Sequence, residues 1–302
     1  MIDTLDEDVL DAVQNGPAIE VAIRPEGGEQ VEPVVQPAVQ QEKPAKRGLA
    51  GVISGKAAEP PIVMVYGDGG IGKSTFASGA PKPIFIDLEK GLGTIGADRF
   101  PVVESSSEVE SQLSTLLVED HDYRTVVIDS VDCLEAMMLR EICVIKGWKS
   151  LADSPYSSYR KILPAYWDRI VNLLKELHFR KRMIIILIAH SQITRVEDPE
   201  NPAYDMHCPK LEPKTTATLC EWVNAVLYAD LEKVVRTVDK KFDQTRSIAS
   251  PVIGENGGMN GQRILRGYKT PGCTAKNRYG ISENIPLSWS AFFKYVQAAW
   301  KN

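Results

Sequence analysis

The sequence predicts an α/β fold in which a mostly parallel central sheet is covered by helices. The first observation is a series of four apolar runs of strand length: Ile62–Tyr66, Pro83–Asp87, Thr125–Asp129 and Met183–His190. Each run is apolar throughout, as expected for strands buried on both faces. The second observation is that helical stretches separate the runs, near Ser74–Ser78, Glu108–Leu117, Cys133–Lys146 and Tyr159–Phe179. This alternation is typical of an open sheet whose ligands bind beyond the carboxyl ends of the strands.

The last part of the chain has a different pattern. Short β-rich segments predict an antiparallel extension or hairpins at Val226–Tyr228, Val234–Val238 and Arg263–Tyr268. A final helix is expected over Trp289–Trp300. We therefore expect residues 60–302 to form one folded core.

Residues 1–59 do not resemble a packed domain. They are rich in Pro, Gln, Glu and Val and carry a net charge of −6, which predicts a disordered acidic tail. Within the tail, four apolar residues fall at helical spacing: Leu5, Val9, Leu10 and Val13. A short amphipathic helix that docks on a replication or recombination protein is therefore the alternative for this segment.

Composition excludes several classes of protein. The net charge of the chain is −5 and that of the tail is −6, so the rest of the chain is about neutral and contacts with DNA would have to come from local basic patches. The five scattered cysteines form no metal-binding pattern and indicate reduced thiols in a cytoplasmic protein. No apolar run is long enough to span a bilayer, so no membrane partner is expected.

The segment between the first strand and the first helix carries the strongest motif. Residues 67–74 read Gly-Asp-Gly-Gly-Ile-Gly-Lys-Ser, which matches the phosphate-binding loop GxxxxGK[ST]. Glycines let several backbone N–H groups point at one anion, and the lysine reaches the β- and γ-phosphates. The predicted nucleotide-binding residues are Gly67, Asp68, Gly69, Gly70, Ile71, Gly72, Lys73, Ser74 and Thr75. ATP is the expected nucleotide.

A magnesium site is predicted beside this loop. Residues 125–130 read Thr-Val-Val-Ile-Asp-Ser, an apolar strand that ends in Asp129. In a P-loop protein such a carboxylate holds Mg²⁺ together with the loop hydroxyl, here that of Ser74. The alternative is that Asp129 caps the following helix, although Ser130 is a better cap residue.

ATP hydrolysis also needs a residue that orients or deprotonates water. The position after Asp129 is a serine, so this carboxylate has to come from elsewhere. The second strand ends at Asp87, and Glu89 follows just past the carboxyl edge. We interpret Glu89 as the catalytic residue; the alternative is a solvated loop charge paired with Lys90.

The order of these elements resembles the RecA-like ATPase core. The resemblance rests on GxxxxGKS, Phe85-Ile-Asp-Leu-Glu89, Val127-Ile-Asp-Ser130 and the strand Ile184–Gln192. It implies that Glu89 activates water. Members of this family usually carry a glutamine near the end of the fourth strand to sense the γ-phosphate. This chain has His190 there and Gln192 two places on, so either a sensor or a structural histidine fits.

A second resemblance lies near the end of the core. Lys276 and Arg278 are two apart on a segment expected to be extended, so their side chains point the same way. They resemble the Lys-x-Arg element of RecA-like hexameric helicases, which reaches into the nucleotide of a neighbouring subunit. This resemblance implies a homo-oligomer, ring or filament, in which both residues are catalytic; a basic surface strand is the alternative.

Residues 60–302 as a whole are similar to phage-encoded RecA-like ATPases of the single-strand-annealing recombinase type. The similarity rests on Pro81-Lys-Pro83, Asp87–Leu92 and Ala275–Gly280. It implies single-stranded DNA as a partner and the host cytoplasm as the location. In RecA-like proteins two loops face DNA, here 147–156 and 194–213. Cations and aromatics are the expected contacts: Trp148, Lys149, Tyr156, Arg195, Tyr204 and Lys210.

Two other functions remain open from the sequence. A P-loop kinase of a small metabolite would need an acceptor pocket and an arginine-rich lid. A nucleotide-gated helicase loader would hydrolyse ATP slowly and bind a replication protein through residues 1–59. Phosphate transfer to an added acceptor, or co-purification that depends on the tail, would distinguish them.

Overall fold

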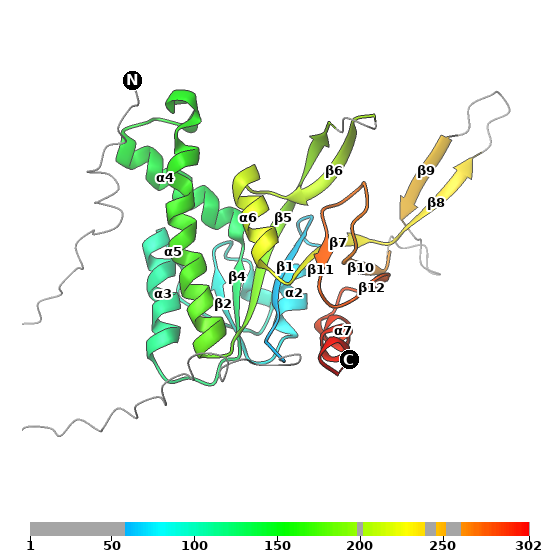
Figure 1. Ribbon diagram of the computed structural model, residues 1–302, viewed down its shortest axis with the longest axis horizontal. Helices are drawn as coiled ribbons and strands as arrows, with labels where there is room; N and C mark the ends of the chain where they lie inside the picture. Colours follow the sequence, from blue (N-terminus) through cyan, green and yellow to red (C-terminus); the bar gives the residue numbers. More distant parts are fainter. Residues whose placement is uncertain (1–57, 198–201, 239–245, 252–260, 302) are drawn as a thin grey trace, which may run out of the picture. The chain divides into compact units, whose positions relative to one another are not determined.

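The computed structural model describes residues 58–197, 202–238, 246–251 and 261–301 (Figure 1). The expectations for the tail, including its amphipathic segment, concern residues that lie outside these ranges apart from Ala58 and Glu59. Among the residues described, no helix combines the length and the apolar character that crossing a bilayer requires.

A ten-stranded sheet forms the centre of the fold, in the order β12-β10-β7-β1-β5-β4-β2-β3, with β11 beside β7 and β6 beside β5. Six strands run parallel: β1 (Ile62–Gly67), β2 (Pro83–Asp87), β3 (Asp98–Arg99), β4 (Thr125–Asp129), β5 (Ile184–Val196) and β7 (Ala225–Leu231). Four are antiparallel to their neighbours: β6 (Tyr204–Pro209), β10 (Arg263–Arg266), β11 (Lys276–Asn277) and β12 (Asn284–Pro286). Within the described ranges, the strands β8 (Lys233–Val238) and β9 (Arg246–Pro251) pair with each other and with no other strand. The predicted α/β class with a mostly parallel sheet is confirmed.

Helices cover both faces of this sheet, which explains why its central strands are apolar throughout. From β1, Met64 and Tyr66 join the apolar residues of one layer. This layer consists of α3 (Ser106–Val118), α4 (Val131–Lys146), α5 (Tyr159–Arg180) and α6 (Pro213–Trp222). The alternate residues Val63 and Val65 pack toward α2 (Lys73–Ser78) and α7 (Trp289–Lys301) on the other face. All four β1 side chains are fully buried.

Two regions differ from the sequence expectations. The segment Val226–Tyr228 was expected in an antiparallel extension, but β7 is parallel to β1 and antiparallel only to β10 and β11. The segment 194–213 was expected to be a loop. Instead β5 continues past His190 and pairs with β6 in a hairpin that projects from the sheet (Figure 1), and α6 follows directly.

Three short 3-10 helices complete the described elements: η2 (Leu92–Thr94), η3 (Leu151–Asp153) and η4 (Pro155–Ser157). The last two lie within 147–156, the other segment expected to be a loop. There the capping box of Ser150 and Asp153 gives the chain a defined turn.

Candidate nucleotide-binding site

The parallel register brings the predicted site residues to one edge of the sheet. Gly67 at the end of β1 pairs with His190 of β5, and Asp87 of β2 pairs with Asp129 of β4. All four residues stand where the parallel pairing of their strands ends, which is the edge at which open α/β sheets bind ligands. Four segments far apart in the sequence therefore meet around the loop.

The loop itself has the backbone that its glycines predict. Gly70 and Gly72 have φ angles of 74° and 109°, a region that L side chains rarely adopt. A Cβ at Gly72 would also lie 3.2 Å from Nη1 of Arg263 in β10, so this arginine lies against the loop. Arg263 was not singled out from the sequence, because its proximity to the loop depends on the antiparallel pairing of β10 with β7.

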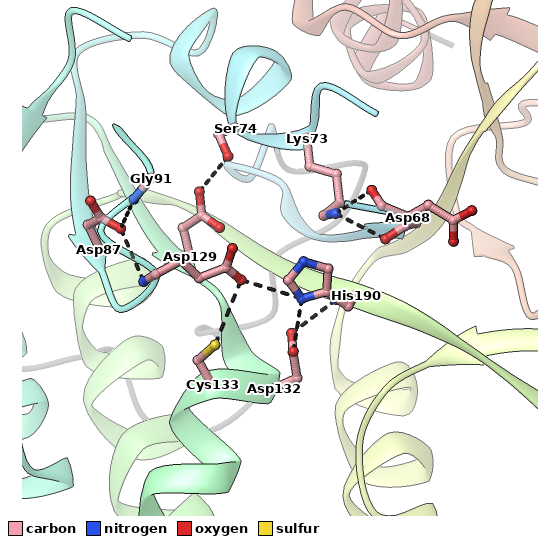
Figure 2. A network of polar contacts seen from close by, with 11 residues as sticks. Asp68, Lys73, Ser74, Asp87, Gly91, Asp129, Asp132, Cys133 and His190 are labelled. Carbon is pink, nitrogen blue, oxygen red and sulfur yellow. Dashed lines mark hydrogen bonds and ion pairs between the residues drawn. The ribbon is translucent and has the colours of Figure 1, made fainter. Parts of the chain in front are cut away.

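Lys73 is buried and is held by the loop it belongs to. Its Nζ donates hydrogen bonds to the carbonyl oxygens of Gly67 and Asp68, at 3.0 and 2.9 Å (Figure 2). Burial lowers the pKa of Lys73, while the nearby carboxylates of Glu89 and Asp129 act in the opposite direction. The ammonium group is thus kept at the loop.

Ser74 and Asp129 form the other side of the site. The hydroxyl of Ser74 donates a hydrogen bond of 2.6 Å to Oδ2 of Asp129. Burial raises the pKa of Asp129 to about 6, against the lowering effect of this hydrogen bond. A hydroxyl beside a buried carboxylate is a set of oxygen ligands that suits Mg²⁺, and a bound cation would offset the cost of burying that charge. The residues present therefore fit the ion.

Asp87 organises the turn that carries Glu89. Its carboxylate accepts hydrogen bonds from the backbone N–H groups of Glu89, Gly91 and Leu92, at 3.2, 3.3 and 3.4 Å. The N–H of Leu88 donates to the carbonyl of Asp129 at 2.7 Å. The turn is thereby tied to both β2 and β4, which fixes where Glu89 leaves the sheet edge.

His190 contacts the predicted catalytic carboxylate. Its Nδ1 lies 3.4 Å from Oε1 of Glu89 and 2.9 Å from Oδ2 of Asp132 in α4. The contacts of Glu89 are thus with His190 and, at 3.8 Å, with the thiol of Cys133. Asp132 was not singled out from the sequence, since it meets His190 only through the packing of α4 beside β5.

Gln192 lies elsewhere. Its side-chain amide donates to the carbonyls of Pro209 and Leu211, both at 3.2 Å, and so anchors the base of the β5–β6 hairpin. Of the two side chains that the resemblance offered as a sensor, His190 is the one in contact with Glu89.

Lys276 and Arg278 stand at the opposite end of the sheet from the loop. The N–H of Arg278 bonds to the carbonyl of Asn224, and Asn224 bonds in turn to Ile62, where β1 begins. The length of β1 separates this point from the loop, a span of about 17 Å. Nζ of Lys276 donates to the carbonyls of Cys220 and Glu221 at the end of α6, at 2.9 and 2.7 Å. The side chains of Lys276 and Arg278 thus differ in surroundings, because Arg278 is exposed.

The six residues expected to contact DNA are divided between the two segments. Lys149, Tyr156, Arg195 and Lys210 are exposed, while Trp148 is partly buried against the core. In the hairpin, Arg195 is paired with Asp205 and Tyr204 with Val196. Adjacent positions on a strand face opposite sides, so Arg195 and Tyr204 do not form one cation–aromatic surface. The backbone N–H of Lys210 bonds to the carbonyl of His190 at 2.9 Å, which connects the hairpin to the site.

The chain is similar to a protein family, to a curated protein and to a solved structure. A family model described as an AAA domain matches residues 59–279. The SPbeta prophage-derived uncharacterized protein YorG of Bacillus subtilis (strain 168) is 25% identical over 179 residues, 57% of this chain. The chain spans about half the length of this curated relative, 51%. Among solved structures, the crystal structure of the RadB recombinase is similar over 57% of this chain and 75% of that one, with 14% identity and a TM-score of 0.33.

The family model extends over the loop, the strand ends with Asp87, Asp129 and His190, and the segment up to Tyr279. It covers well over half of the chain. The chain therefore belongs to the AAA domain family.

Proposed function

We propose that this chain is a Mg²⁺-dependent ATPase that acts on single-stranded DNA in phage recombination, annealing or replication. The observation that supports hydrolysis best is the meeting of four groups at one sheet edge: the Lys73 ammonium, the Ser74–Asp129 pair, the Glu89 carboxylate and the His190 ring. Such a set supplies a cation for the phosphates, ligands for the metal ion and a general base for water, which phosphoryl transfer to water requires.

Each of these groups has one task in the proposed reaction. Bound Mg²⁺ would neutralise charge on the phosphates. Lys73 exchanges its loop carbonyls for phosphate oxygens, and the glycine-rich backbone holds the anion. Glu89 accepts a proton from the attacking water or orients that water toward the γ-phosphate. Its turn is fixed by Asp87, so the carboxylate is in position before the nucleotide binds.

Arg278 supports an oligomer in this proposal. Its backbone stands at the amino end of β1, about the length of a strand away from the loop of its own chain. A nucleotide that contacts Arg278 would accordingly be one held by a second copy, as an arginine finger acting in trans requires. Lys276, held by two carbonyls of α6, would keep the segment in place.

The DNA part of the proposal draws on the exposed cations and aromatics of the segments 147–156 and 194–213, and on the prophage origin of the curated relative. Lys149 and Tyr156 in one segment, and Arg195 in the other, are accessible to a strand. Single-strand binding commonly combines such cations with stacking rings. A replication or recombination protein bound through residues 1–59 would then bring the ATPase to its DNA.

The experiment is ATP turnover with and without an oligonucleotide, in single- and double-stranded form and at two salt concentrations. We expect turnover that requires Mg²⁺, rises with single-stranded DNA, and loses that stimulation at high salt because phosphate contacts are screened. Turnover without stimulation or salt-dependent binding would contradict the DNA part. Phosphate transfer to an added acceptor would instead favour a kinase.

A further inference from the structure

Asp132 holds His190 at two points. Its Oδ1 accepts a hydrogen bond from the backbone N–H of His190 at 3.0 Å, and its Oδ2 lies 2.9 Å from the ring Nδ1. Asp132 is 9% exposed and stands in the first turn of α4. Both oxygens are thus directed at one residue, whose backbone and ring are fixed together.

This geometry determines which ring nitrogen carries hydrogen. Nδ1 faces a carboxylate oxygen of Asp132 and, at 3.4 Å, one of Glu89. Ionised carboxylates only accept hydrogen bonds, so Nδ1 is the donor and the proton of a neutral ring resides there. Burial raises the pKa of Asp132, but hydrogen bonds from the amide and ring of His190 outweigh it and leave the pKa below its ordinary value. Asp132 is therefore an anion at neutral pH.

The other ring nitrogen, Nε2, is left for the ligand. His190 stands beside Gly67 across the β1–β5 ladder. Figure 2 shows its ring between Asp132 on one side and the part of the site with Lys73 on the other. With Nδ1 engaged by carboxylates, the edge that remains available is the one toward the phosphate-binding loop.

We propose that Asp132 is a positioning residue that sets the ring orientation and the tautomer of His190, so that Nε2 faces the γ-phosphate and Nδ1–H faces Glu89. This inference rests on the proposed ATP hydrolysis and deepens it. The side-chain amide of Gln192 is hydrogen-bonded to carbonyls of the β5–β6 hairpin. In the proposed site, the Asp132–His190 pair therefore lies between the nucleotide and Glu89.

Asp132→Asn is the diagnostic substitution. Asparagine nearly conserves the shape but offers one acceptor oxygen, whereas His190 presents two donors, its backbone N–H and Nδ1–H. In the variant, the NH₂ group of the amide would face one of these two donors, and that hydrogen bond would be lost. We expect kcat for ATP to fall about 10- to 100-fold, as for other partners that orient a reacting group, with KM changed less than about threefold because the loop is untouched.

A double-mutant cycle separates positioning from general damage. In a His190→Ala background, Asp132→Asn should change kcat less than about twofold, since the group it positions is gone. Asp122→Asn, at an exposed carboxylate paired with Lys82, is the matched control and should behave as wild type. If the fold-losses in kcat of the two single substitutions multiply in the double variant, the two residues act independently, which would overturn the proposal.

A spectroscopic measurement tests the same contact without any turnover. The chain has four histidines, so imidazole ¹⁵N–¹H spectra are simple, and His190→Gln assigns the signal. At alkaline pH we expect the neutral ring of His190 to carry its proton on Nδ1, and Asp132→Asn to raise the Nε2–H form. A wild-type ring protonated on Nε2, or a ring unaffected by Asp132→Asn, would overturn the inference. If the wild-type protein hydrolyses no ATP, the proposed function fails, while this spectrum still decides on the Asp132–His190 contact.

Discussion

The hydroxyl of Ser74 and the carboxylate of Asp129 are joined by a hydrogen bond of 2.6 Å between residues 55 positions apart. The contact ties the start of α2 to the end of β4. Each residue was predicted from the sequence as a magnesium ligand, and the parallel register of β1, β5 and β4 is what makes them neighbours. Their ligand role remains a prediction that substitutions can test.

Asp129→Asn should stabilise the nucleotide-free protein. Burial raises the pKa of Asp129 from 3.8 to about 6, so the folded state binds the proton more tightly than the unfolded state. The resulting stability is present below about pH 4 and is lost as the pH rises through about 6, with a penalty of roughly 1–3 kcal/mol above that. Asparagine carries no charge and still accepts the Ser74 bond.

Thermal melts without Mg²⁺ check this prediction. At pH 8 we expect the variant to melt a few degrees above wild type, in keeping with about 2–4 °C per kcal/mol for a domain of this size. Near pH 4 the two should converge, and Mg²⁺-dependent turnover should be lost. A variant that melts below wild type at pH 8 would contradict the account of Asp129.

Lys73→Ala should abolish nucleotide binding without unfolding the protein. Burial lowers the pKa of Lys73, so its buried charge costs stability and its loss leaves the core intact. Lys82→Ala, at an exposed lysine, is the control. Equilibrium dialysis with labelled ATP measures the binding, and ATP retained by Lys73→Ala at wild-type affinity would be incompatible with the proposed role.

Glu89→Gln should bind ATP and stop hydrolysis. The amide keeps the size of the side chain but cannot accept a proton, so we expect kcat to fall by about 10²–10⁴ with binding unchanged. Filter binding and turnover on the same preparation give both quantities. Normal turnover would place the base elsewhere.

Mixing variants tests whether Arg278 acts in trans. Arg278→Ala and Glu89→Gln should each be inactive alone. In an equal mixture, about a quarter of head-to-tail interfaces pair an intact Glu89 with an intact Arg278, so partial activity should return. No recovery in subunits shown to co-assemble would indicate action in cis or no role.

Lys276 and Arg278 should differ in what their loss does to stability. Lys276→Ala removes two hydrogen bonds to the last carbonyls of α6, at a cost of about 1 kcal/mol. Arg278→Ala changes an exposed side chain and should stay within about 0.5 kcal/mol. Urea unfolding of both variants measures this, and equal losses would argue against the helix-end role of Lys276.

Much of the fold follows from the sequence because its strands are buried on both faces. Pro83–Asp87 and Thr125–Asp129 were predicted with the bounds that the structure has, since an apolar run that ends in aspartate marks both the strand and its carboxyl end. The helices α4 and α5 agree within a few residues for the same reason: their apolar spacing is regular.

The β5–β6 hairpin and α6 were not predicted, because their residues lack a regular apolar pattern. The continuation of β5 from Ser191 to Val196 has only two apolar residues, Ile193 and Val196, and is partly exposed, so it lacks the continuous apolar run of a buried strand. Its pairing with β6 makes it a strand. α6 begins with Pro213, follows a charged segment and buries only Thr215 and Leu219 within its length. Short elements that form by pairing or packing with distant residues are difficult to predict from local composition.

The site was predictable where a motif determines position and not where packing does. Lys73, Ser74, Asp129 and Glu89 are identified by their place relative to strand ends. Asp132 and Arg263 reach the site through contacts between distant elements, α4 with β5 and β10 with the loop. An aspartate three residues after Asp129 gives no sign of that from sequence alone.

The binding of magnesium and a non-hydrolysable ATP analogue to the wild-type protein, followed by isothermal titration calorimetry, tests the central claim most directly. We predict saturable heat at one site per chain that disappears in Lys73→Ala. Absence of heat from a folded wild-type protein, or undiminished heat from the variant, would contradict the assignment of this loop as the nucleotide site.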